Sequence, residues 1–220
     1  MRLTWYGHAA FRIEAADVDI IIDPYKYPDA GGYLPIDDSA DLVLISHVND
    51  RYHSHTGQIR PPFELLNGLQ IPAEGVEYRG VSIRSIHVFE NDSKLPEDEV
   101  SILDLSVDGM RIVFLGDLGH ALSVDEANRL RGADILLASA GGPPTIALPL
   151  IPALVAQLEP RIIIPMHYKT PKINLPIQPV EDFFEVLPQW RVERLSSSTV
   201  ELSADDLPPR GVILSLQHAR

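Results

Sequence analysis

In the first half of the chain, apolar residues form short runs with the length and alternation typical of β-strands. The Gly7-His8 pair interrupts the first run and indicates a bend or bulge within it. Asp108 and Gly109 form a strong turn dipeptide between two runs and predict a hairpin there. The predicted strands span residues 3–13, 18–22, 41–45, 76–86 (a hairpin-like pair), 100–107 and 110–115.

After residue 115 the pattern changes to an alternation of buried strands and helices. Ser123 and Glu126 have the spacing of a capping box, and Gly132 is a suitable stop for the helix that follows Ser123. The predicted helices span residues 124–131, 151–158 and 180–187, and the predicted strands span residues 135–138 and 161–164. Strand hairpins followed by strand–helix units predict a layered α/β protein with helices outside the sheets.

Four of the predicted strands are followed closely by a residue that can ligate a metal. These residues are His47, His87, Asp117 and His167. Sites in α/β sheets form beyond the carboxyl ends of strands, where loops from distant parts of the sequence converge. Three imidazoles and a carboxylate suit zinc, iron or manganese. The pattern therefore predicts a metal site at one rim of the sheets.

Composition narrows the function classes further. The 220 residues include 18 basic and 31 acidic ones, for a formal net charge of −13, which argues against nucleic acid or an anionic membrane as a partner. Cysteine is absent, so disulfides, a thiol nucleophile and thiolate ligands are excluded. The start of the chain lacks the features of a secretory signal, and the apolar stretch 146–158 is too short to span a bilayer. We expect a cytoplasmic protein.

Several segments resemble the metallo-β-lactamase superfamily, in particular the branch that includes ascorbate-phosphate lactonase-like proteins and other small zinc-dependent hydrolases. The matching segments are Trp5-Tyr6-Gly7-His8-Ala9-Ala10-Phe11, Ile22-Asp23-Pro24, Asp41-Leu42-Val43-Leu44-Ile45-Ser46-His47, Gly116-Asp117-Leu118-Gly119-His120, Ser139-Ala140-Gly141-Gly142 and Ile164-Pro165-Met166-His167-Tyr168-Lys169-Thr170. They occur in family order and leave only the tail after about Trp190 unmatched. The resemblance implies a four-layer αββα sandwich formed by a single domain, residues 1–220.

The sequence departs from the family's central signature, His-x-His-x-Asp-His. His47 keeps the first position, but Asn49, Arg51 and Tyr52 stand where the family has His, Asp and His. The resemblance matches the remaining family ligands to His87, Asp117 and His167. With part of the signature lost, we expect one ion (zinc, iron or manganese) rather than two, held by His47, His87, Asp117 and His167.

Two other interpretations of the altered signature stay open. His53 or His55 can enter from a rearranged loop and restore a ligand, and a one-residue slip would bring Asp50 or His53 near the lost positions. Alternatively, Arg51 fills the metal region, because a guanidinium is permanently charged and cannot ligate. In that case the protein is a non-catalytic binding or regulatory module on a degenerate hydrolase scaffold.

The activity implied by the resemblance is metal-assisted attack of water or hydroxide on an ester, lactone or phosphodiester-like bond. Asp117 and Asp50 are the candidate catalytic residues, with Asp50 or the metal-activated hydroxide as base. Arg51, Lys169 and His120 are candidates for binding a small, anionic substrate, and His120 can instead cap the entrance of a helix.

Three further positions have both a functional and a structural interpretation. His8 can line the pocket or pack as a hydrogen-bonded core residue. Asp23 can accept a hydrogen bond from a ligating histidine or simply end a strand before Pro24. Residues 90–99 are expected to form a solvated loop at the mouth of the pocket.

Overall fold

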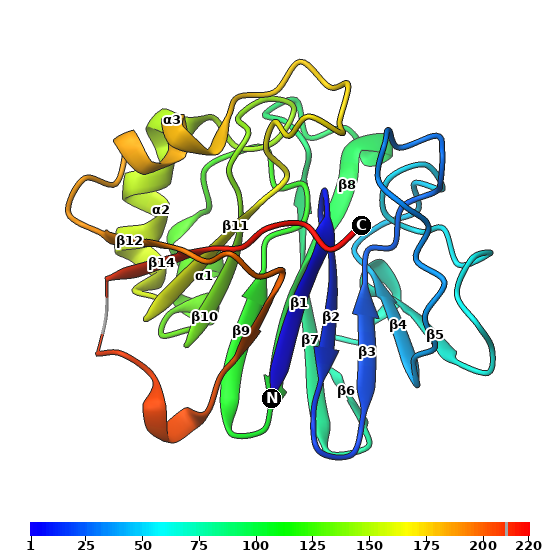
Figure 1. The fold of residues 1–220 in the computed structure, drawn as a ribbon. Coiled ribbons are helices and arrows are strands. Elements are labelled where there is room, and N and C mark those ends of the chain that lie inside the picture. Colours follow the sequence, from blue (N-terminus) through cyan, green and yellow to red (C-terminus); the bar gives the residue numbers. More distant parts are fainter. Residues whose placement is uncertain (210) are drawn as a thin grey trace.

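Two β-sheets share one hydrophobic core in the computed structural model, which describes residues 1–209 and 211–220 (Figure 1). The first sheet has the strand order β13-β1-β2-β3-β4-β5, with β1 (Arg2–Gly7), β2 (Ala10–Glu14), β3 (Asp19–Ile22), β4 (Leu42–Ile45), β5 (Glu64–Asn67) and β13 (Thr199–Glu201). The second has the order β12-β14-β11-β10-β9-β8-β7-β6, with β6 (Val76–Tyr78), β7 (Val81–Phe89), β8 (Glu99–Val107), β9 (Met110–Phe114), β10 (Ile135–Ser139), β11 (Ile162–Met166), β12 (Arg191–Arg194) and β14 (Val212–Ser215).

Three α-helices and four short 3-10 helices complete the described part of the chain. They are α1 (Val124–Leu130), α2 (Ile151–Leu158), α3 (Val180–Glu185), η1 (Gly68–Gln70), η2 (Pro96–Asp98), η3 (Leu148–Leu150) and η4 (Ala204–Asp206). The α-helices lie beside β10, β11 and β14, on the left in Figure 1. None of the described helices combines the length and the hydrophobicity needed to cross a membrane.

The first sheet is buried on both faces. Along β4, Leu42 and Leu44 pack into the core shared with the second sheet, whereas Val43 and Ile45 pack into a separate cluster on the opposite face. That second cluster is completed by residues from connecting segments, including Tyr25. Because successive side chains of a strand point to opposite faces, the residues of β4 alternate between two hydrophobic clusters. The outer face of the first sheet is covered by loops rather than helices.

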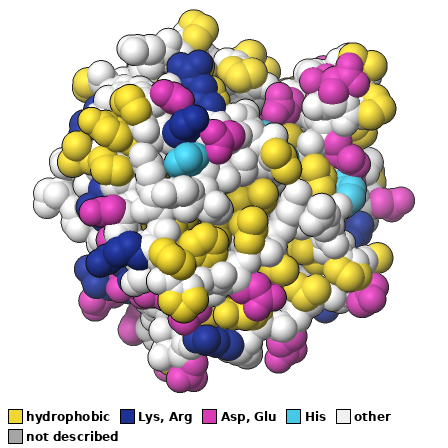
Figure 2. All heavy atoms as spheres, turned by 90° about the vertical axis from the view of Figure 1, so that its right-hand side faces the viewer, with side chains coloured by type: hydrophobic (Ala, Val, Ile, Leu, Met, Phe, Trp, Pro, Cys, Tyr) yellow, Lys and Arg dark blue, Asp and Glu magenta, His cyan; other side chains and the backbone are white. Residues whose placement is uncertain are grey.

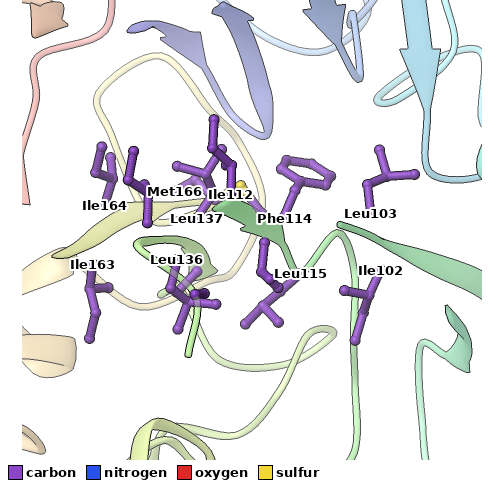
Figure 3. Packing of buried hydrophobic residues seen from close by; sticks show 14 of the residues in the cluster. Ile102, Leu103, Ile112, Phe114, Leu115, Leu136, Leu137, Ile163, Ile164 and Met166 are labelled. Atoms are coloured by element: carbon purple, nitrogen blue, oxygen red, sulfur yellow. The ribbon is translucent and has the colours of Figure 1, made fainter. Parts of the chain in front are cut away.

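The second sheet has the same two-faced burial (Figure 3). Phe114 and Ile164 extend toward the first sheet, and Leu136 and Ile163 extend the other way, toward the side of the helices. The mixed α/β class with two packed sheets is thus confirmed, with its helical layer on the side of the second sheet.

Helix α1 begins with the capping box that its sequence predicts. The Ser123 hydroxyl accepts a hydrogen bond from the Glu126 backbone N–H (3.3 Å), and the Glu126 carboxylate accepts one from the Ser123 N–H (2.7 Å). Two backbone donors at the start of the helix are satisfied in this way.

Replacing Ser123 by alanine removes one side of this box. We expect S123A to lower the free energy of unfolding by about 1 kcal/mol, measured by urea denaturation of the two proteins side by side. S123D retains a capping oxygen and should stay close to the wild type. A loss in S123D equal to that in S123A would show that the cap contributes nothing specific.

Two predicted elements differ from those observed, and the tail contributes strands that the sequence analysis does not predict. Residues 3–13 form the antiparallel pair β1 and β2 rather than one bent strand, because the chain reverses at residues 8 and 9. Strand β7 continues to Phe89, three residues beyond the predicted end. The unmatched tail supplies β13, which pairs with β1, and β12 and β14, which extend the second sheet. The tail therefore contributes strands to both sheets.

Candidate metal centre

Six buried side chains from five loops meet at one rim of the two sheets. They are His8 in the turn between β1 and β2, Asp23 after β3, His47 after β4, His53 in the loop that follows, Asp117 after β9 and His167 after β11. With the exception of His53, each closely follows the carboxyl end of a strand, where the loops of α/β proteins form sites.

His53 links two carboxylates through its two ring nitrogens. Its Nδ1 lies 2.9 Å from Asp23 Oδ2, and its Nε2 lies 2.9 Å from Asp117 Oδ2. Because a carboxylate only accepts, both nitrogens must donate and the ring is an imidazolium. Burial lowers the pKa of His53, but Asp117 and Asp23 outweigh burial and raise this pKa to about 10.

Asp117 carries a negative charge that is paired with the positive charge of His53. Burial acts to raise its pKa, but the neighbouring His53 and His167 outweigh that effect and hold the pKa of the Asp117 carboxyl far below its usual range. His167 Nε2 lies 3.6 Å from Asp117 Oδ1, the oxygen that His53 does not use.

The other three imidazoles have ring nitrogens without a partner. Among the described residues, the buried side-chain atoms that lack a hydrogen bond include both ring nitrogens of His8, Nε2 of His47, Nδ1 of His167 and Oδ1 of Asp117. Burial lowers the pKa of each of these histidines, so all three are neutral near pH 7 and carry a free lone pair. The rings are close: the His8 centroid lies 4.2 Å from that of His167.

These atoms fit a metal ion. Ligand atoms of His8, His53 and His167 lie within 4.8 Å of one another, and so do those of His47, His53 and Asp117. A buried polar atom without a partner costs about 1–3 kcal/mol, so a cluster of them in one place is costly unless it binds something. Nitrogen and carboxylate donors match zinc, iron or manganese.

Hydrogen bonds orient two histidines of the cluster, His47 and His53. The Ser46 hydroxyl donates to Asp23 Oδ2 (2.6 Å), so its oxygen is the acceptor for His47 Nδ1–H (3.0 Å). That tautomer leaves His47 Nε2 as a free lone pair. Asp23 orients His53 in the same manner, which is the usual arrangement around a metal-binding histidine.

The backbone at the site is held in an unusual conformation. His8, Asp23 and His167 have φ angles of 51°, 46° and 49°, in the left-handed region, which costs non-glycine residues about 1–2 kcal/mol. The His8 carbonyl compensates in part by accepting hydrogen bonds from His167 N–H (2.9 Å) and Trp5 Nε1 (3.0 Å). Strain of this kind is typical of functional sites.

The structure brings together three of the four predicted ligands, His47, Asp117 and His167, but not His87. Strand β7 continues past His87, so that residue lies within the strand and not at its end. Its side chain is 44% exposed, its Nδ1 lies 3.0 Å from Glu99 Oε1, and it belongs to neither group of candidate ligand atoms. The true end of β7 places Glu90 near the cluster, with Oε1 3.4 Å from His47 Nε2.

Asp50 and Arg51 lie outside the cluster. The Asp50 side chain is 64% exposed and pairs with Lys26 Nζ (3.2 Å) and with His55 Nδ1 (2.9 Å). Arg51 Nε donates to the Asp29 carbonyl (2.7 Å), and its guanidinium lies 5.0 Å from the Tyr52 ring centroid. The interpretation in which Arg51 fills the metal region is therefore wrong, since His53 lies there instead.

Lys169 and His120 are both engaged by backbone groups. Lys169 Nζ donates to the carbonyls of Ile173 (2.7 Å) and Leu175 (3.2 Å). His120 Nε2 accepts from the Phe89 N–H (3.2 Å), and its Nδ1 donates to the Ala121 carbonyl (2.8 Å). Both nitrogens of His120 are thus used in holding neighbouring loops.

Sequence reasoning ranked the remaining site residues too low. The sequence offers His53, His55 and Asp50 as alternatives for the lost ligands, allows structural as well as functional interpretations of His8 and Asp23, and predicts a solvated loop for residues 90–99. A signal for Glu90 does exist in the sequence: it directly follows the apolar run once that run is extended to Phe89.

The chain is similar to named proteins and to solved structures. A UPF0173 protein of Pyrococcus abyssi is 27% identical over 188 residues, covering 77% of this chain and 84% of that protein. A UPF0173 metal-dependent hydrolase of Pyrococcus furiosus is 28% identical over 193 residues, covering 77% and 85%. The crystal structure of a candidate Zn-dependent hydrolase of the metallo-β-lactamase superfamily from Thermotoga maritima is 26% identical, with a TM-score of 0.77, and covers 98% of this chain and 99% of that one.

A more distant solved structure shares the fold. Isothiocyanate hydrolase from Delia radicum gut bacteria superimposes with a TM-score of 0.62 at 13% identity, covering 84% of this chain and 91% of that one. The family model for the beta-lactamase superfamily domain matches residues 2–167, which contain all six residues of the cluster. The chain therefore belongs to the beta-lactamase superfamily, as its resemblance to the metallo-β-lactamases predicts.

Proposed function

We propose that this protein, as a single domain of residues 1–220, is a metal-dependent hydrolase. The observation that carries the proposal is the convergence of buried, unpartnered nitrogen and oxygen atoms from His8, His47, Asp117 and His167 around His53. Its relatives named as metal-dependent hydrolases support the same activity. When bound, the ion supplies a Lewis acid that activates water and polarises a carbonyl or phosphoryl oxygen.

His53 favours one ion over two. It belongs to both groups of candidate ligand atoms, and a neutral imidazole nitrogen has one lone pair to offer. His53 therefore serves either group but not both at once. Its Nδ1 stays on Asp23 in both cases, which leaves Nε2 as the ligating atom.

A cavity next to the cluster offers a place for the substrate. It has a volume of about 590 Å³ and is lined by Pro28, Asp29, Ala30, Gly31, Arg51, Tyr52, Asn174 and Leu175. The Tyr52 ring connects it to the cluster, since its centroid lies 5.1 Å from that of His8. Figure 2 shows acidic and basic side chains interspersed on the face beside β4 and β5.

The lining of this cavity suits a small anionic substrate with an ester, lactone or phosphodiester-like bond. Arg51 lies at the cavity and carries a permanent charge. Lys169 is a weaker candidate because backbone carbonyls occupy its ammonium group, and Asp50 faces Lys26 and His55 rather than the cluster. Asp117 is the one predicted catalytic carboxylate that lies in the cluster.

Metal content is the decisive measurement. Protein purified without an immobilised-metal column should contain about one zinc, iron or manganese ion per chain, and H167A should lose most of it while staying folded. Hydrolysis of p-nitrophenyl acetate, a γ-lactone or bis(p-nitrophenyl) phosphate should disappear with a chelator and return with metal.

Four outcomes would contradict the proposal or part of it. No metal after incubation with each candidate ion would exclude a metal mechanism. Activity that survives both chelation and H167A would do the same. Metal binding without hydrolysis of any ester, lactone or phosphodiester would favour a non-catalytic binding protein, and two ions per chain would contradict the single-ion part.

A further inference from the structure

Glu90 is fixed against the loop that carries Asp117. Its N–H donates to the Asp98 carbonyl (2.9 Å), and the preceding Phe89 carbonyl accepts from Gly119 N–H (2.9 Å). A Cβ atom at Gly119 would lie only 1.6 Å from the Glu90 carbonyl oxygen. Glycine at position 119 thus allows a close backbone contact with residue 90. This contact holds Glu90 beside Asp117, which lies two residues before Gly119 in the chain.

The Glu90 side chain turns toward the free nitrogen of His47. Glu90 Oε1 lies 3.4 Å from His47 Nε2, and no hydrogen bond joins the Glu90 carboxylate to another residue of the described chain. Because His47 carries its proton on Nδ1, a carboxylate oxygen and a nitrogen lone pair face each other. Two such acceptors face each other favourably when a proton or a metal cation lies between them.

The spacing of the two atoms also fits a shared ion. Two donors at 2.0–2.1 Å from one tetrahedral metal lie about 3.3 Å apart, close to the observed 3.4 Å. The negative charge nearby calls for a cation as well, because Glu90, Asp23 and Asp117 contribute three carboxylates and His53 a single positive charge.

We infer that Glu90 is a metal ligand, paired with His47 and supplied by the end of β7. This inference rests on the proposed function and adds a second carboxylate to the donor set. A carboxylate in this position makes the site richer in oxygen, which shifts its preference toward manganese or iron(II) relative to an all-imidazole site.

The test compares E90Q with E99Q, which serves as a matched control. Glu99 also lies beside an imidazole, with Oε1 3.0 Å from His87 Nδ1, but that pair is exposed and apart from the cluster. Manganese and cobalt(II) are titrated into chelator-treated wild type and both variants, with binding measured by competition against a coloured chelator. Cobalt(II) absorption spectra report the ligands directly.

We expect E90Q to weaken manganese binding at least about tenfold and to change the cobalt(II) spectrum, while E99Q stays within about twofold of the wild type. Both variants should keep the wild-type circular dichroism. If H167A abolishes binding but E90Q binds as the wild type does with an unchanged spectrum, the ligand assignment is wrong and the proposed function stands. If the wild type binds neither of these ions and also takes up no zinc or iron, the proposed function fails, and this inference fails with it.

Discussion

Chelator-treated H53Q is expected to lose about 3–5 kcal/mol of stability and also to lose its capacity to bind metal. His53 is fully buried and donates to both Asp23 and Asp117, so its removal leaves two buried carboxylates without their shared counter-charge. Breaking a buried ion pair from one side typically costs this amount. Metal binding is lost because His53 is the ligand common to both groups of donor atoms.

The matched control for this variant is H55Q. His55 lies two residues further along the same loop, and its Nδ1 also lies 2.9 Å from a carboxylate, that of Asp50. The Asp50 side chain is 64% exposed, however, so solvent screens the pair and it should contribute little to stability. Urea denaturation and metal titration of both variants check the prediction. Equal effects in H53Q and H55Q would contradict the central position of His53 and reopen the choice between the two histidines.

Three candidate ligands could be predicted from the sequence by one local rule, namely that metal ligands come shortly after the end of a buried strand. His47, Asp117 and His167 each come just after a continuous apolar run, and the carboxyl ends of β4, β9 and β11 do meet at one rim. The rule requires only the ends of buried strands, which hydrophobic runs define well when the next residues are polar or glycine.

The same rule failed at β7 because the polar His87 interrupts the apolar run before the strand ends. Val88 and Phe89 continue the strand beyond His87, but the side chain of His87 lies on the exposed face. A strand alternates between faces, so a shift of the strand end by three residues exchanges an exposed side chain for one that points into the site. Glu90, and not His87, is therefore the residue that this segment brings near His47.

His53 and His8 are placed by contacts that the spacing of the signature does not reveal. His53 is placed by Asp23, which comes from the end of β3, 30 residues earlier in the chain. His8 enters the site because the chain reverses there, in a left-handed turn that only the pairing of β1 with β2 defines. Neither relation is visible in the spacing of the altered signature, where an alignment without gaps pairs the lost positions with Asn49, Arg51 and Tyr52.

The stability of chelator-treated protein is expected to pass through a maximum near pH 6.5, the ordinary pKa of histidine. On the alkaline side, His53 has a folded pKa raised to about 10, so it binds more protons in the folded state than in the unfolded state between pH 6.5 and 10. Stability therefore falls as the pH rises through that range. On the acidic side, burial lowers the folded pKa values of His8, His47 and His167, so the unfolded state binds more protons below pH 6.5 and stability falls as the pH decreases.

The variant H53Q distinguishes the loss of stability above pH 6.5 from the loss below pH 6.5. Urea denaturation from pH 5 to pH 9.5, a range above the ordinary pKa values of the carboxyls, should show the decline above pH 6.5 in the wild type and its absence in the variant. The acidic limb should persist in H53Q, because burial is the largest cause of the lowered pKa values of His8, His47 and His167 and does not depend on residue 53. A wild-type profile that is flat from pH 6.5 to 9.5 would contradict this prediction. It would mean that His53 is a neutral ring between Asp23 and Asp117 and not an imidazolium, so that the two carboxylates lack the positive charge assigned to it.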